Sequence, residues 1–343
     1  MNGFITEVLT QTGPKEMREK LEQLEQMSLL LDPTSGQRRE MTTQTIDFAD
    51  TFLDNLPGMN AFVPDGGASS LLLQAFEEEP ADLASLFETL DKAVATEGIN
   101  PASGGHLGYI PGGGVYPSAL GDFIADVTNR YSGVSYASPG AAKMELQLVR
   151  WMTGLVGYPP TAGGDLTSGG SIANLTAIIA ARESMGLRSR HIVDSCIYMT
   201  ADTHHCVDKS LRAAGLCECR KRRVPMDDQF RMELSALEDM ILQDKAAGLR
   251  PWLITASAGT TDTGAIDPIN AIAELADQHG LWLHVDAAYG GFFLLCEEGR
   301  QVLRGLDRAH SIVLDPHKGM FLPYGSGAVL VRNVEWLARS QSY

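Results

Sequence analysis

Short β-rich runs alternate with helical patterns from about Ser118 onward, and this alternation constrains the fold more than any other feature. The β-rich runs lie at 196–200, 252–255, 281–285, 311–314 and 328–331. The helical patterns lie at 121–128, 141–154, 174–185, 207–214, 234–247 and 269–278. Strands that alternate with helices of this length form βαβ crossovers, in which helices cover both faces of a parallel sheet. We therefore expect an α/β fold with a mostly parallel sheet.

The N-terminal third lacks this alternation. Apolar residues at helical spacing predict an amphipathic helix at 15–31 that packs through its apolar face; they are Met17, Leu21, Leu24, Met27 and Leu31. The Pro and Gly residues of 32–67 predict loops that join short helices, and a second helical pattern covers 83–96. We therefore divide the chain into an N-terminal helical and loop segment, 1–115, and a large α/β domain, 116–343.

The composition argues against several classes of function. Acidic residues number 43 and basic residues 27, and the net charge of −16 repels phosphate backbones and anionic lipid. We expect neither nucleic acid nor a membrane as a partner. No apolar run approaches the roughly 18 residues that span a bilayer, and Met1–Phe4 does not begin a signal peptide, which predicts a cytoplasmic location. The five cysteines form no Cys-x-x-Cys pair, which indicates reduced thiols and no zinc site.

Two charged residues follow β-rich runs at the positions where such a sheet binds ligands, the carboxyl ends of its strands. Asp286 follows the run at 281–285, and Asp315-Pro316-His317-Lys318-Gly319 follows the run at 311–314. Taken singly, a strand-end Asp is an ordinary turn residue and a lone Lys an ordinary solvated charge. Taken together they favour a site, because a lysine beside Pro, His and Gly can hold a partly desolvated amine that forms an imine with an aldehyde.

A segment of small residues at 165–174 opens one of the predicted helices. Free backbone N–H groups and the positive end of the helix dipole would face a phosphate there, with Ser168 and Ser171 as hydroxyl donors. The segment is neither a Walker A loop nor a dinucleotide fingerprint. Adjacent His204 and His205 project in different directions, which disfavours a shared metal and leaves one imidazole to stack on a flat ring. A phosphate cradle, a carboxylate, an imine-forming lysine and a stacking imidazole are what pyridoxal 5′-phosphate (PLP) requires.

Five sequence runs resemble the signatures of the group II PLP-dependent amino acid decarboxylases, which include aromatic amino acid, glutamate and aspartate decarboxylases. They occur in the order of that family and are TSGGSIANLTA, ADTHHCVDKS, SAGTTDTGAIDPI, HVDAAYGG and DPHKGMFLPYGSG. The resemblance spans about 104–332. It implies the large domain of a PLP-dependent transferase of fold type I, preceded by a helical segment. It also implies a homodimer with its sites at the interface.

The same resemblance assigns roles to single residues. It implies that Lys318 carries the internal aldimine, that Asp286 pairs with the pyridine nitrogen and that His204 stacks over the ring. The spacing to Val207 and Lys209 selects His204 over His205. The further cofactor positions are Ala288 at the opposite ring face, Gly170, Ser171, Asp315 and His317 at the phosphate, and Ser257 near the ring hydroxyl.

These assignments predict decarboxylation of an L-amino acid to an amine and CO2, through an external aldimine and a quinonoid. The segment 106–116 is either a wall of the site or a turn-rich connector. It holds Tyr109, Ile110, Pro111 and Tyr116 but no Arg or Lys, which favours an aromatic or other apolar substrate over glutamate. Two alternatives stay open. One is another PLP enzyme, such as an aldehyde-forming oxidative deaminase, a lyase or an aminotransferase; the other is an inactive cofactor-binding fragment.

The sequence departs from the resembling enzymes at two places. Gly319 follows Lys318, where the aromatic branch often has an aromatic residue. The chain also ends soon after Lys318, where those enzymes continue with a mobile loop that bears a catalytic tyrosine and then with a small C-terminal domain. We expect that domain to be absent, and we do not equate Tyr343 with the loop tyrosine.

Overall fold

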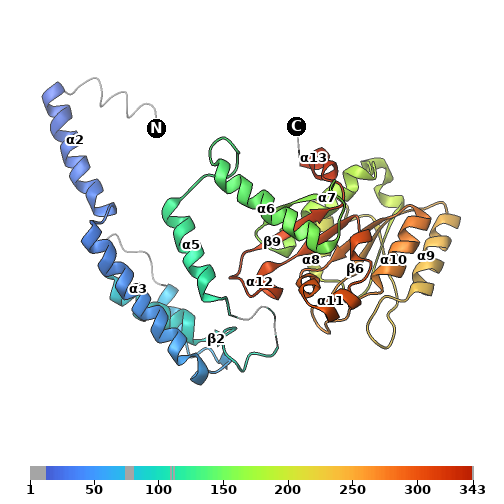
Figure 1. Ribbon diagram of the computed structural model, residues 1–343, viewed down its shortest axis with the longest axis horizontal. Coiled ribbons are helices and arrows are strands. Elements are labelled where there is room, and N and C mark those ends of the chain that lie inside the picture. Colours follow the sequence, from blue (N-terminus) through green and yellow to red (C-terminus); the bar gives the residue numbers. More distant parts are fainter. Residues whose placement is uncertain (1–12, 74–80, 109, 111–112, 342–343) are drawn as a thin grey trace. The chain divides into compact units, whose positions relative to one another are not determined.

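The structure is a computed structural model that describes residues 13–73, 81–108, 110 and 113–341. Its contacts divide the chain into two compact units, Met1–Leu107 and Gly108–Tyr343 (Figure 1). The boundary lies a few residues before the one expected from the sequence. It stays a prediction that the second unit is the PLP-binding domain and that the first unit is a separate N-terminal helical and loop segment.

The first unit is mainly helical, and its helices differ in part from those expected. It contains α2 (Pro14–Ser28), α3 (Ser35–Asn55), α4 (Leu83–Leu90) and a small antiparallel pair, β1 (Phe62–Val63) and β2 (Gly98–Ile99). The helix predicted at 15–31 is confirmed as α2 with a 3₁₀ turn after it, but the expected packing of its apolar face is not, because Leu21, Leu24, Met27 and Leu31 are exposed. The prediction of loops and short helices after residue 31 was wrong, because α3 is long. Thr34 and Gln37 form a capping box that starts α3, and Gly36 lies in the first turn.

The second unit is built on a seven-stranded sheet in the order β3-β9-β8-β7-β6-β4-β5. Strands β5, β4, β6, β7 and β8 lie side by side in this order and are parallel to one another. Strand β9 runs antiparallel to both of its neighbours, β8 and β3. The expected mostly parallel sheet is confirmed. The strands are β3 (Gly163–Thr167), β4 (Ser195–Met199), β5 (Arg220–Arg223), β6 (Arg250–Ser257), β7 (Trp282–Asp286), β8 (Ser311–Leu314) and β9 (Gly327–Val331).

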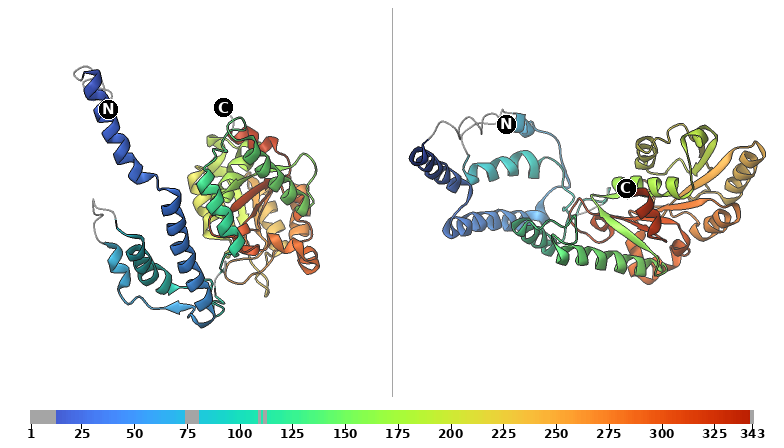
Figure 2. Two further views of the ribbon diagram at one scale, coloured as in Figure 1. Left: turned by 60° about the vertical axis from the view of Figure 1, so that its left-hand side comes forward. Right: turned by 90° about the horizontal axis from the view of Figure 1, so that it is seen from above.

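Helices cover both faces of this sheet (Figures 1 and 2). The helices of the second unit are α5 (Tyr116–Thr128), α6 (Pro139–Val156), α7 (Gly170–Ser184), α8 (His205–Ala213), α9 (Leu234–Ala246), α10 (Ile269–His279), α11 (Glu297–Val302), α12 (Pro316–Gly319) and α13 (Glu335–Gln341). Of these, α5 has no buried residue and does not cover the sheet (Figure 1). Buried residues alternate between the faces along each central strand. In β7, Leu283 and Val285 join one core cluster, whereas Trp282 joins a second cluster that includes residues of α7 and α8.

Strands β3 and β5 were not predicted, and each has a physical reason for its atypical sequence. A Cβ atom on Gly164 would lie 2.2 Å from the carbonyl oxygen of Val329 in β9, so β3 needs glycine where a strand usually has a β-branched residue. Strand β5 is the edge of the sheet and carries only basic residues. Charged side chains at an edge strand discourage pairing with another chain.

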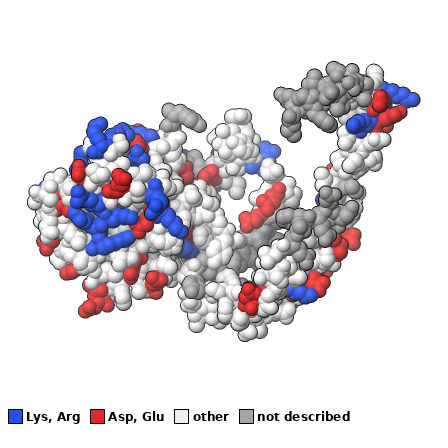
Figure 3. Space-filling model, turned by 180° about the vertical axis from the view of Figure 1, so that it is seen from behind, with Lys and Arg blue, Asp and Glu red and all other residues white. Residues whose placement is uncertain are grey.

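The basic residues of β5 are partly neutralised. Lys221 and Arg223 form ion pairs of 2.8 and 2.7 Å with Asp208, and Arg222 pairs with Asp244. Lys and Arg side chains gather on one face of the second unit (Figure 3), although the whole chain is acidic. No helix among the described residues is long and apolar enough to cross a lipid bilayer.

Candidate active site

A cavity of about 370 Å³ lies at the carboxyl ends of the central strands. It brings together residues from β6, β7, α7, α8 and the segment after β8. All nine residues that the sequence analysis singled out for the cofactor line it: Gly170, Ser171, His204, Ser257, Asp286, Ala288, Asp315, His317 and Lys318. Their separate roles stay predictions; the structure shows that all nine lie at one cavity.

Lys318 and Asp286 reach the cavity from neighbouring parallel strands. Asp286 is the last residue of β7, and Lys318 lies in the short helix α12 that follows β8. The Lys318 side chain is one-quarter exposed, and its Nζ lies 3.3 Å from Asp315 Oδ2. Asp286 is almost buried, and its Oδ1 accepts a 3.1 Å hydrogen bond from the Ala288 N–H. A lysine amine and a carboxylate are thus held at one cavity by rigid elements.

The predicted anion cradle at 165–174 lies at the N-terminus of α7. Gly169 precedes the helix with φ +133°, a backbone conformation that L side chains rarely adopt. The first intrahelical bonds are those from Ile172 and Ala173 to the Gly169 carbonyl, so the N–H groups of Gly170 and Ser171 precede them. A Cβ atom on Gly170 would lie 2.7 Å from Asp315 Oδ2. Glycine therefore keeps this corner of the cavity open.

His204 and His205 have different environments, although their ring centroids are only 4.1 Å apart. His204 is the N-cap of α8, where its Nδ1 accepts a 3.3 Å bond from the Cys206 N–H, and it lines the cavity. Burial and the neighbouring His205 lower the pKa of His204, so its imidazole is neutral at pH 7. His205 is exposed and does not line the cavity. A neutral imidazole at the wall is suited to stacking on a flat ring.

The donors and acceptors at the cradle fit PLP. Asp315 is buried, and its Oδ1 has no hydrogen-bond partner among the described residues. Burial raises the pKa of Asp315, whereas Lys318 and His317 oppose that effect. His317 Nδ1 donates to the Ser326 carbonyl, which leaves Nε2 3.7 Å from Asp315 Oδ2. The helix N–H groups are donors for a phosphate, which only accepts, and the unused Asp315 oxygen fits beside it as a donor in the protonated form that burial favours.

The cavity also has residues that the sequence analysis missed. Asn174 lines it one turn after Gly170, and Tyr289 and Tyr324 contribute aromatic rings. Cys206 lines it too, but burial raises the pKa of its thiol to about 12, so it is no nucleophile at pH 7. The polar residues His284 and Asp286 in the buried run Trp282–Asp286 indicate that buried partners exist, because buried polar groups need them, but do not identify Asn174.

The expected wall at 106–116 is not found at this cavity. Among the residues that line the cavity, neither Ile110 nor Tyr116 occurs, and Tyr116 instead begins α5. Tyr109 and Pro111 lie outside the described residues. Among the described residues, the aromatic lining of the cavity comes from Tyr289, which follows β7, and Tyr324, which follows α12.

The fold and the cavity are those of a PLP-dependent enzyme of fold type I. The chain matches the family described as pyridoxal-dependent decarboxylase conserved domain over residues 67–343, and it belongs to that family. PLP is the cofactor of this family.

Relatives with different substrates are similar to the chain. The aromatic-L-amino-acid decarboxylase of Bacillus atrophaeus is 31% identical over 316 residues, which cover 92% of this chain and 65% of the relative. The L-2,4-diaminobutyrate decarboxylase of Rhizobium meliloti is 36% identical over 217 residues, 63% of this chain and 43% of the relative. The crystal structure of Catharanthus roseus tryptophan decarboxylase with L-tryptophan has a TM-score of 0.84 at 26% identity, and the match covers 91% of this chain and 69% of that one.

Some curated relatives match this chain over most of its residues, and the match covers slightly less than two thirds of the length of the two relatives named next. The shares are 65% for the Bacillus enzyme and 64% for the aromatic-L-amino-acid decarboxylase of Bos taurus. The family membership is therefore a finding, whereas the activity, substrate and partners of the whole protein are proposals.

Proposed function

We propose that the protein is a PLP-dependent carboxy-lyase that converts an L-amino acid to an amine and CO2. The observation that carries this proposal is the cavity at the strand ends, where Lys318, Asp286 and the N-terminus of α7 meet. Family membership and decarboxylase relatives support it. Bound PLP supplies an electron sink for the Cα–carboxylate bond that breaks.

The chain's own residues have separable tasks in this proposal. The Lys318 amine would hold the cofactor aldehyde covalently, and as a free amine it would carry a proton. Asp286, as a carboxylate, would hold a proton on the ring nitrogen. His204 of the α8 N-terminus and Ala288 of the segment after β7 would flank the ring. The helix N-terminus at Gly170 and Ser171 would hold the phosphate, with Asp315 and His317 beside it, and Ser257 would bind near the ring hydroxyl.

We propose an aromatic or other apolar amino acid as the substrate. Tyr289 and Tyr324 supply aromatic surface in the cavity, and no Arg is among the described residues that line it. A side-chain carboxylate is bound best by a bidentate Arg, so this lining favours a substrate without one. Relatives named for tryptophan, histidine and diaminobutyrate show that the family includes several substrates.

A substrate panel tests both the reaction and the substrate. With tyrosine, tryptophan, phenylalanine, glutamate, aspartate and diaminobutyrate, we expect kcat/KM for the best aromatic substrate to exceed that for glutamate by at least about tenfold, because the lining offers no partner for a second carboxylate. Amine and CO2 should form in equal amounts. Aldehyde with ammonia would contradict decarboxylation, and a dominant acidic substrate would contradict only the substrate proposal.

We also propose that the protein forms a homodimer. No residue of α5 is buried, and its apolar side chains are exposed: Tyr116, Leu120, Phe123, Ile124 and Val127. An apolar helix face of this extent is typical of a subunit interface. A second copy is the proposed occupant because the family resemblance implies paired subunits.

A charge placed on α5 should separate the two subunits. We expect the wild-type chain to have the mass of a dimer in light scattering, and Ile124→Glu to shift it to the monomer, because a buried unpaired carboxylate at an interface is costly. Leu242→Glu is the matched control: Leu242 is 49% exposed on α9, on the other side of this unit from α5 (Figure 1). A monomeric wild type, or an Ile124→Glu variant that remains a dimer, would refute the proposed interface.

The proposed location is the cytoplasm. All five cysteines are free thiols in the structure, and Cys196, Cys206 and Cys219 are buried. Free thiols persist in a reducing compartment.

A further inference from the structure

A chain of polar side chains lies beneath the cavity, on one face of β7. Side chains alternate between the faces of a strand, so Trp282, His284 and Asp286 point to the same face. Strand β8 places Ser311 directly opposite His284 in the register of the sheet. Asn174 of α7 reaches the same face from above. Trp282 and His284 are almost completely buried, and Ser311 and Asn174 are completely buried.

Hydrogen bonds connect these side chains without a gap. Trp282 Nε1 lies 2.9 Å from Ser311 Oγ, which lies 2.8 Å from His284 Nδ1. His284 Nε2 lies 2.8 Å from Asn174 Oδ1. Asn174 Nδ2 donates to Asp286 Oδ2 at 3.1 Å and to the Gly170 carbonyl at 2.9 Å. The chain thus runs from the core to the carboxylate in the cavity and touches the first residue of the phosphate cradle.

The chemistry of its two ends fixes the direction of every bond. The Trp282 indole can only donate, and the Asp286 carboxylate can only accept. Because Asn174 Nδ2 donates to Asp286, Asn174 Oδ1 faces His284 Nε2 and accepts a hydrogen bond from it, so a neutral His284 carries its proton on Nε2. His284 Nδ1 is then an acceptor, and Ser311 donates to it while accepting from Trp282. Asp286 Oδ2 thus receives a donor from Asn174, and Oδ1 receives one from the Ala288 backbone N–H, which is outside this chain of side chains.

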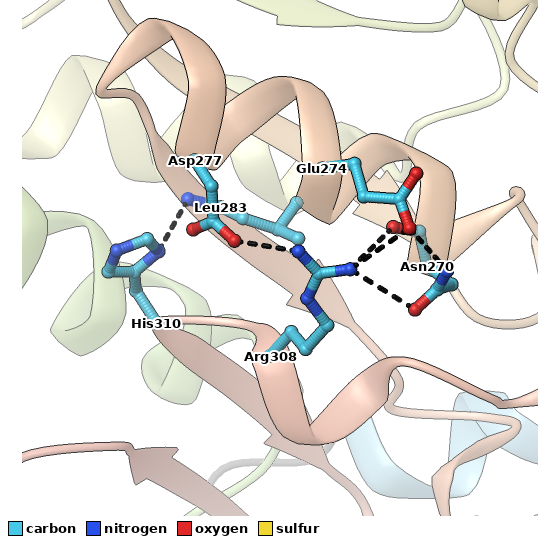
Figure 4. A network of polar contacts seen from close by, with 6 residues as sticks. All are labelled: Asn270, Glu274, Asp277, Leu283, Arg308 and His310. Carbon is cyan, nitrogen blue, oxygen red and sulfur yellow. Dashed lines mark hydrogen bonds and ion pairs between the residues drawn. The ribbon is translucent and has the colours of Figure 1, made fainter.

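The core holds the far end of the chain in place. The Trp282 ring stacks on His310 with centroids 4.9 Å apart and contacts Trp336 at 4.7 Å. His310 Nδ1 accepts a 3.0 Å bond from the Leu283 N–H of β7 (Figure 4). Figure 4 also shows Arg308, just before His310, between Asp277 and Glu274 of α10. Trp282 therefore has little freedom to turn its N–H away from Ser311.

We propose that His284 and Asn174 are positioning residues that orient Asp286 and keep it a carboxylate toward the ring nitrogen of PLP. His284 fixes the Asn174 amide, and the amide N–H stabilises the charge on Asp286. This inference rests on the proposed function, because it assigns Asp286 to the ring nitrogen. Burial lowers the pKa of His284, so the neutral tautomer required here persists at pH 7.

Two variants at one position separate positioning from bulk structure. His284→Leu removes the donor to Asn174, whereas His284→Gln keeps an N–H near the place of Nε2. We expect the dissociation constant for PLP to rise about tenfold in His284→Leu and to stay near the wild-type value in His284→Gln. With ¹⁵N-labelled PLP, the ring nitrogen should be protonated in the wild type and in His284→Gln, and shifted toward the unprotonated form in His284→Leu.

Tyr198→Phe is the matched control, because it removes another buried hydrogen bond of this sheet, the 2.8 Å bond from Tyr198 to Asp244. It should lower the midpoint of thermal unfolding and leave PLP affinity and the ring-nitrogen signal unchanged. If His284→Leu behaves in the same way, His284 is merely structural and the proposal is wrong. If the wild-type protein itself does not attach PLP at Lys318, the proposed function fails instead.

A measurement on the wild-type protein does not depend on how a variant folds. The protein has eight histidines, which can be labelled with ¹⁵N and distinguished by NMR. The His284 signals should show a proton on Nε2 and none on Nδ1. The tautomer should be the same with and without PLP. A proton on Nδ1 would reverse the direction of the chain and overturn the inference.

Discussion

Replacing Lys318 by alanine should abolish covalent attachment of PLP and lower the decarboxylation rate by at least about a thousandfold. Lys318 carries the amine that the proposed reaction requires, and it lies at the cavity with Asp286 and the cradle of α7. Borohydride reduction of the wild-type protein with PLP, followed by peptide mapping, should place the cofactor on the peptide that contains Lys318. The variant should give no labelled peptide.

Two further variants show whether the loss is due to the amine itself. Lys318→Arg keeps a cation beside Asp315, which lies 3.3 Å from the lysine Nζ, but its guanidinium does not form the bond. It should fold as well as the wild type and remain inactive. Lys209→Ala removes an exposed lysine of α8 and should change neither labelling nor rate. A labelled peptide that contains a different lysine would show that the assignment of Lys318 is wrong.

The fold could be predicted wherever local sequence and burial agree. Strands β4, β6, β7, β8 and β9 are buried over most of their length, so their sequences are rich in apolar and β-branched residues. Strand β3 owes its glycines to the close approach of β9, and β5 is an exposed edge; neither gives an apolar run. The length of α3 was missed because Pro33 and Gly36 were taken as signs of a loop, although Pro33 precedes the capping box of Thr34 and Gln37 and Gly36 lies within it.

The nine residues predicted to bind the cofactor could be placed at one cavity because each lies in or beside one of the short runs that resemble the family, at a strand end or a helix start. His284 and Asn174 could not, because their contact depends on how α7 lies over β7. These residues are 110 positions apart, and no local pattern specifies a hydrogen bond at that separation. The prediction that Tyr116 contributes to a substrate wall was wrong for a related reason. It rested on the composition of the segment 106–116 alone, whereas Tyr116 is the first residue of α5 in the structure.

Replacing Gly170 by valine should weaken PLP binding by about a hundredfold. The new Cβ atom would lie 2.7 Å from Asp315 Oδ2 and 3.1 Å from Oδ1, and Asp315 is 2% exposed, so it has little room to move. The two methyl groups of valine would add bulk at the helix N-terminus that is proposed to bind the phosphate. Titration of the PLP-free protein with PLP, followed by the change in tryptophan fluorescence, measures the effect.

A matched glycine separates this steric effect from the effect of valine on a helix start. Gly140 lies in the first turn of α6, as Gly170 does in α7, but a Cβ atom there would meet nothing within 4 Å. Gly140→Val should therefore bind PLP like the wild type, and both variants should retain the far-ultraviolet circular dichroism of the wild type. Equal affinities for Gly170→Val and the wild type would show that the phosphate does not lie at this N-terminus. A loss of similar size in both variants would assign the effect to helix formation, because only the valine at position 170 meets a buried carboxyl group.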